Sequence, residues 1–125
     1  SNLTFNLTDM KVLIVEDEIM AQKSLTRVLT QNFPDMQIVG TSTSIKGTVA
    51  WLNTPGNEVD IIFMDVELAD GECFEIFRQT EVKAKVIMTT AYDSYALKAF
   101  EETLEDDKNY TKRTGFFEKI KDMFN

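Results

Sequence analysis

Histidine is absent from this chain of 125 residues, and cysteine occurs once, at Cys73. The absence of histidine excludes imidazole both as a catalytic base and as a metal ligand. A single cysteine can form no disulfide within the chain, which suits a reducing compartment such as the cytoplasm. Any metal ion would therefore be held by oxygen ligands, and these favour hard cations such as Mg²⁺.

Basic residues and long apolar runs are also scarce. The chain has 13 lysines and arginines against 21 aspartates and glutamates, for a formal net charge of −8. That balance argues against nucleic-acid binding by this domain, which needs clustered positive charge. No apolar run approaches the roughly 20 residues that span a bilayer, and the first residues show no signal-peptide pattern. We therefore expect one globular domain with neither a nucleic-acid nor a membrane partner.

Apolar stretches typical of buried strands alternate along the chain with helical patterns. Strands are predicted at 11–15, 36–41, 60–64 and 85–90, and helices at 19–32, from Ser42 or Ser44 to about 52, near 74–79 and from about 93. This alternation with short connections indicates an α/β fold, with a parallel sheet covered by helices on both faces. Within the first helix the periodicity predicts a buried face of Ala21, Leu25, Val28 and Leu29 and an exposed face of Gln22, Lys23 and Arg27.

Polar side chains follow three of these strands, at the edge where ligands bind in open parallel sheets. Glu16 and Asp17 follow the first strand, Asp65 follows the third and Thr90 ends the fourth. Each acid alone is more often a turn former or a helix cap. Together they would repel one another unless a cation such as Mg²⁺ neutralised them. Asp65 could then act as a nucleophile that forms an aspartyl phosphate, with Thr90 bonding a phosphoryl oxygen.

The stretches "VLIVEDE", "FMDVELADG" and "VIMTTAYDSYALKAF" closely resemble the receiver domain of bacterial two-component response regulators, over about Met10 to Glu101. The stretch "TTAYDSYALKAF" is most similar to receivers that precede a LytTR-type DNA-binding domain. The resemblance implies a flavodoxin-like, doubly wound parallel sheet with strand order 2-1-3-4-5, although a fifth strand is not evident in this sequence. It also implies a receiver domain over 10–125, preceded by a disordered or tag-derived segment at 1–9.

The resemblance assigns roles to individual residues. Asp65 matches the phosphoacceptor and is also one of the expected metal ligands. Glu16 and Asp17 match the acidic pair that holds Mg²⁺, with Asp17 the more direct ligand. The backbone carbonyl of Glu67 matches the position that completes the coordination. Thr90 matches the hydroxyl that moves toward the phosphoryl group when the domain switches.

One part of the family pattern is missing. Receivers carry a Lys-Pro pair after a fifth strand, and that lysine would fall at Tyr110, which Lys108 and Lys112 flank. We expect either that 101–113 is divergent, with Lys112 as a substitute for the lysine, or that a segment after Glu101 is missing.

The sequence thus predicts a signalling switch in the cytoplasm rather than an enzyme. A sensor histidine kinase would phosphorylate Asp65 in a Mg²⁺-dependent reaction, and the switch would control an output domain of the transcriptional kind. A homodimer through the fourth and last helices would fit this function. Two alternatives stay open: a phosphorylation-independent interaction module, and a small Mg²⁺-dependent phosphohydrolase. The latter class usually needs a second aspartate where Glu67 stands.

Overall fold

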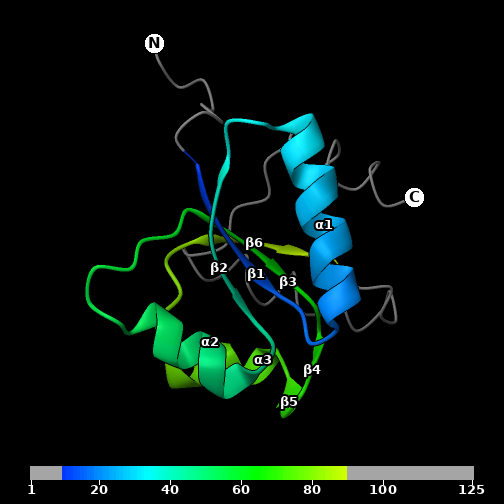
Figure 1. Cartoon of the computed structure of the whole chain (residues 1–125). Coiled ribbons are helices and arrows are strands. Elements are labelled where there is room, and N and C mark those ends of the chain that lie inside the picture. The colour runs from blue at the N-terminus through cyan, green and yellow to red at the C-terminus, as the bar shows by residue number, and fades with distance from the viewer. Residues whose placement is uncertain (1–9, 90–125) are drawn as a thin grey trace.

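The computed structural model describes residues 10–89 of the chain (Figure 1). The N-terminal segment, the predicted fourth and last helices, Thr90 and Lys112 lie outside the described residues, as does the place of a fifth strand. No helix within 10–89 is long and apolar enough to cross a lipid bilayer.

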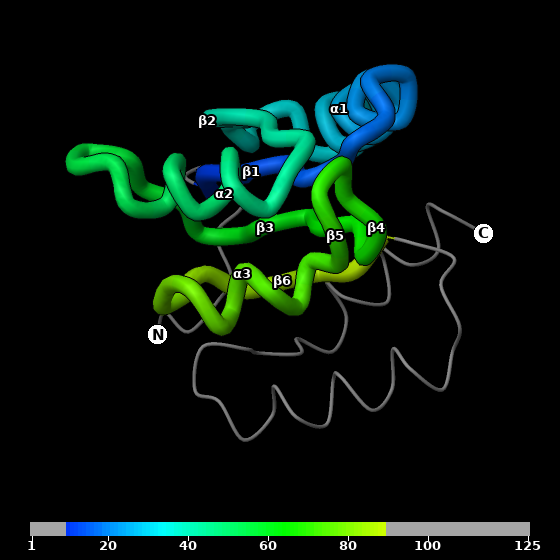
Figure 2. Tube along the Cα trace, turned by 90° about the horizontal axis from the view of Figure 1, so that it is seen from below, coloured from blue at the N-terminus to red at the C-terminus, as the bar shows by residue number. Residues whose placement is uncertain are grey.

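A four-stranded parallel sheet forms the centre of the described chain. Its strands are β1 (Lys11–Val15), β2 (Gln37–Ser42), β3 (Ile61–Met64) and β6 (Lys85–Met88). They are arranged in the order β2-β1-β3-β6, which the view from below shows clearly (Figure 2). These strands are the four that the sequence predicts, and their order confirms the 2-1-3-4 part of the expected topology. They run parallel because a helix returns the chain between one strand and the next.

Helices cover both faces of the sheet and divide the core in two (Figure 1). One cluster packs under α1 (Ile19–Asn32) and includes Val12, Ile14, Leu25, Leu29, Ile61, Phe63 and Ile87. The other lies on the side of α2 (Ile45–Leu52) and α3 (Phe74–Gln79) and includes Leu13, Val15, Ile45, Ile62, Met64, Ile76 and Val86. Alternate residues of β1 and β3 thus point to opposite clusters, which is why these strands are apolar over 12–15 and 61–64.

The first helix begins and ends at the predicted residues, but one prediction about its faces is wrong. Gln22, expected to face solvent, is only 8% exposed and lies among the buried residues of α1 beside Leu25 and Leu29. The periodicity argument assigns polar residues to the outer face, but a polar side chain can be buried where it finds hydrogen-bond partners. The partners of Gln22 are described below with the site.

A short antiparallel hairpin, β4 (Glu67–Leu68) and β5 (Gly71–Glu72), follows β3. Gly71 has a φ of +141°, a region that residues with a side chain rarely adopt. Asp70 accepts hydrogen bonds from the N–H groups of Ile45 (2.7 Å) and Lys46 (3.1 Å) at the start of α2. The hairpin is thereby fastened to the helix, whose N-cap is Ser44, one of the two residues at which the sequence predicts the helix to start.

The pairing of β2 with β1 contains an irregularity. Val12 pairs with Ile38, whereas its neighbour Leu13 pairs with Gly40, so that Val39 is an extra residue in β2. The indole of Trp51 lies against Gly40, where an added Cβ would come within 2.7 Å of its Nε1 atom. Glycine is therefore required at this position by the close approach of the side chain from α2.

Candidate functional site

The ends of β1 and β3 bring the candidate acidic residues together. Val15 pairs with Met64 in the register of these parallel strands, so the next residues, Glu16 and Asp65, leave the sheet at the same edge. The Asp65 N–H donates to the carbonyl of Val15 at 2.9 Å, and the Glu16 N–H donates to the carbonyl of Ser42 at 2.9 Å. The backbone on which the acids sit is thus fixed by bonds to neighbouring strands.

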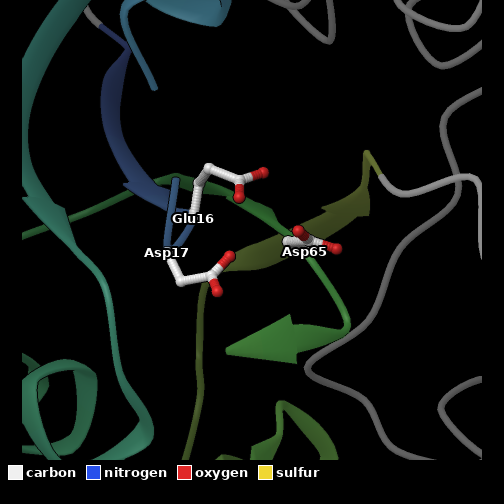
Figure 3. Close-up of side chains that lie close together, drawn as sticks. All are labelled: Glu16, Asp17 and Asp65. Carbon is white, nitrogen blue, oxygen red and sulfur yellow. The ribbon is translucent and has the colours of Figure 1, made fainter. Parts of the chain in front are cut away.

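Three carboxylates converge at this edge, as Figure 3 shows. Glu16, Asp17 and Asp65 each offer one oxygen atom, and these atoms all lie within 4.8 Å of one another. The structure therefore brings together the three acids that the sequence predicts to meet where two neighbouring strands end.

The crowding affects the protonation of Glu16. Burial and, to a smaller extent, the nearby charge of Asp65 raise the pKa of this carboxyl to about 7, in spite of the lowering effect of a hydrogen bond from the Glu18 N–H. That bond is 3.0 Å long. Near neutral pH the Glu16 carboxyl is therefore present in both its protonated and its ionised form, and a bound cation would favour the ionised form.

The donor set fits a hard divalent cation. Its three side chains offer only carboxylate oxygens, the ligands that Mg²⁺ prefers. The ion pairs of Lys11 with Glu58 and of Arg78 with Glu75 lie on other parts of the described chain, so neither neutralises the cluster. A cation at this edge would offset the mutual repulsion of the three carboxylates, which otherwise destabilises the folded chain.

Glu67 and Cys73 flank the cluster. The N–H of Glu67 lies 3.4 Å from Oδ1 of Asp65, so the residue starts the hairpin directly beside the candidate acceptor. Coordination by its carbonyl stays a prediction. Burial raises the pKa of the Cys73 thiol to about 12, with the charges of Asp65 and Glu72 adding to the effect. The thiol is buried in the core and stays protonated, so it packs there and is not poised as a nucleophile.

The rest of the predicted site adjoins the described residues without belonging to them. The N–H of Thr89 donates to the carbonyl of Met64 at 3.2 Å, which carries the pairing of β6 with β3 up to the residue before Thr90. Thr90 and Lys112 themselves lie outside the described residues, and their roles stay predictions. The structure also reveals a residue that the sequence did not nominate: the amide of Gln22 donates to the carbonyl of Glu16 at 2.7 Å.

Comparison with known proteins places this arrangement in context. The sequence model of the response regulator receiver domain matches residues 12–110. A second model, that of the chaperone protein DnaJ C-terminal region, matches only 96–125, which is too little of the chain to assign a family and lies outside the described residues.

Individual relatives give the same picture. The chain is 34% identical over 95 residues to the sensory transduction protein LytT of Bacillus anthracis, which covers 74% of this chain and 37% of the relative. The response regulatory domain of mrkE from Klebsiella pneumoniae is similar in structure, with a TM-score of 0.63, 30% identity and 92% coverage of both chains. A CheX-CheY-BeF3-Mg complex from Borrelia burgdorferi shares the fold, with a TM-score of 0.63 and 22% identity over 91% of this chain and 85% of that one.

Proposed function

Because the chain belongs to the response regulator receiver domain family, we propose that Asp65 is its phosphoacceptor and that Glu16 and Asp17 hold the Mg²⁺ ion the reaction requires. The convergence of these three carboxylates at the ends of β1 and β3 is the observation that carries the proposal. The family assignment establishes a phosphoacceptor signalling domain; the assignment of roles to individual residues is ours.

Each acid has a distinct part in the proposed reaction. An ionised oxygen of Asp65 attacks the phosphorus of the donor, the bond from phosphorus to the leaving group breaks, and the phosphoryl group is left as an aspartyl phosphate. The chain holds this nucleophile in place through the bond of its N–H to Val15. When bound, Mg²⁺ supplies positive charge that offsets the negative charge of the phosphoryl group. Glu16, Asp17 and Asp65 would hold the ion, together with the backbone carbonyl of Glu67.

Signal output is proposed from the resemblance noted in the sequence. Phosphorylation of Asp65 would draw the Thr90 hydroxyl toward the phosphoryl group, with Lys112 as the candidate lysine contact, and would bias a surface used for dimerisation. The donor would be a sensor histidine kinase in the cytoplasm. The chain spans about two fifths of the length of the curated relative LytT, and control of a transcriptional output domain is proposed for the whole protein.

The proposal is tested by intact mass spectrometry of the purified chain with Mg²⁺ and acetyl phosphate. We expect the gain of one phosphoryl group, which disappears in Asp65→Asn and when EDTA replaces Mg²⁺. Absence of modification in a chain that binds Mg²⁺ would refute the phosphoacceptor assignment and favour the phosphorylation-independent interaction module. Sustained release of phosphate from added phosphomonoesters would favour the phosphohydrolase instead.

A further inference from the structure

Gln22 is a buried polar residue that the hydrophobic pattern of α1 does not explain. Its side chain is 8% exposed, on the face of the helix that packs on the sheet. Burying an amide is costly unless its hydrogen bonds are satisfied. An apolar residue would fill this position without that cost, so the amide has a reason to be here beyond packing.

The amide binds the backbone on which the acidic pair is built. Its Nε2 atom donates to the carbonyl of Glu16 at 2.7 Å and to the carbonyl of Ser42 at 3.3 Å. The carbonyl of Ser42 already accepts the N–H of Glu16 at 2.9 Å, so its need for a donor is met. The short bond to Glu16 is therefore the one that defines the role of Gln22.

The Glu16 carbonyl belongs to the peptide group that links Glu16 to Asp17. Rotation of that rigid, planar group would change the direction in which the Asp17 side chain leaves the backbone. Glu18, the N-cap of α1, makes no side-chain capping bond. The loop between β1 and α1 is held by backbone bonds, by the bond of the Glu18 N–H to the Glu16 carboxylate and by Gln22, and of these only Gln22 binds the Glu16 carbonyl through a side chain.

We propose that Gln22 is a positioning residue for the cation site: by fixing the peptide group between Glu16 and Asp17, it presents their carboxylates in the arrangement that binds Mg²⁺. The inference rests on the proposed function of these acids. Gln22 itself touches neither the cation nor the phosphoryl donor. Other partners that orient metal ligands act in the same way. They hold the ligands in place before the cation binds, so that less conformational freedom of the ligands is lost on binding.

The test compares two substitutions that remove buried hydrogen bonds next to the same strand end. Gln22→Met keeps the length of the side chain but has no N–H donor. Thr48→Val is the matched control, because the fully buried Thr48 hydroxyl donates to the carbonyl of Ser44 (2.7 Å) and shares a hydrogen bond with Oγ of Ser42 (2.9 Å), and neither bond involves Glu16. Both variants are compared with the parent by urea denaturation in EDTA and by calorimetric titration with Mg²⁺.

We expect both variants to be less stable, but only Gln22→Met to bind Mg²⁺ more weakly, by about tenfold. Equal Mg²⁺ affinity in Gln22→Met and the parent would overturn the inference, as would an equal loss in Thr48→Val. Gln22→Ala gives a second measurement if Gln22→Met does not fold, because alanine introduces no strain and favours the helix; it too must weaken Mg²⁺ binding. Failure of the parent itself to bind Mg²⁺ would overturn the proposed function, and the inference with it.

Discussion

Replacement of Asp65 by asparagine should stabilise the protein when no metal is present. The oxygen atoms of Asp65 and its two acidic neighbours lie within 4.8 Å of one another. At this separation two unit charges repel by about 0.9 kcal/mol even with the dielectric constant of water. Two such pairs are relieved by the substitution, and salt at about 0.1 M screens part of the effect. We expect Asp65→Asn to raise the free energy of unfolding by about 1 kcal/mol at pH 8 in EDTA.

The gain should depend on pH in a defined direction. Since the pKa of Glu16 is raised from its ordinary value of 4.5 to about 7, the folded state binds more protons than the unfolded state between these values. Stability of the parent therefore falls as the pH rises through this window. At pH 5.5 Glu16 is protonated in the folded protein, one of the two repulsive pairs is gone, and the gain from Asp65→Asn should fall to about half.

The assay is urea denaturation followed by circular dichroism, in EDTA at both pH values. Asp35→Asn is the control, because it removes the same charge from an exposed loop residue far along the chain from the cluster. An Asp65→Asn variant no more stable than Asp35→Asn at pH 8 would refute the crowding of the three carboxylates. Saturating Mg²⁺ should reverse the order of stability, because the variant loses a ligand.

Three further results are expected. Mg²⁺ affinity should fall by up to about tenfold per pH unit below pH 7, because the cation competes with the proton of Glu16; calorimetric titrations at pH 6 and pH 8 would measure this, and equal affinities would contradict it. Gly40→Ala should destabilise the protein by about 1–3 kcal/mol and shift the fluorescence of Trp51, because the new Cβ would lie 2.7 Å from its indole nitrogen; an unchanged urea midpoint would show that the indole moves freely. Asp70→Ala should lower the urea midpoint at neutral pH, since the backbone N–H groups that start α2 lower the pKa of Asp70 below its ordinary 3.8. The difference from the parent should shrink as the pH falls through and below that value. A difference independent of pH would argue against stabilisation by the bonds from these N–H groups to Asp70.

Much of the fold could be predicted because its elements carry strong apolar patterns. α1 (Ile19–Asn32), α3 (Phe74–Gln79) and β1 (Lys11–Val15) begin and end at the predicted residues, and the other three strands of the sheet differ from expectation by one or two residues at their ends. The hairpin at 67–72 was missed because strands of two residues have no periodicity to detect. The sequence does carry a glycine there: Gly71, the first residue of β5, adopts a positive φ.

The three carboxylates of the candidate site could be grouped from the sequence, whereas the residue that binds the backbone beneath them could not. Parallel strands place the residues after β1 and β3 at one edge, so Glu16, Asp17 and Asp65 could be grouped from topology alone. Gln22 could not, because periodicity assigns a polar residue on a helix to solvent unless its buried partners are known. Those partners are backbone carbonyls of β1 and β2 ends, which have no signature in the amino-acid sequence.

The irregular pairing of β2 also bears on how copies of this protein behave toward one another in concentrated solution. β2 is an outer strand of the sheet formed by residues 10–89, and outer strands offer hydrogen-bonding groups on which a neighbouring molecule can add its own strand. The extra residue between Ile38 and Gly40 breaks the even spacing of those groups, and the twist that such a bulge introduces turns the strand away from a flat partner. The β2 edge of the sheet therefore discourages the addition of strands from other molecules, which protects against aggregation a chain whose central strands β1 and β3 are almost entirely apolar.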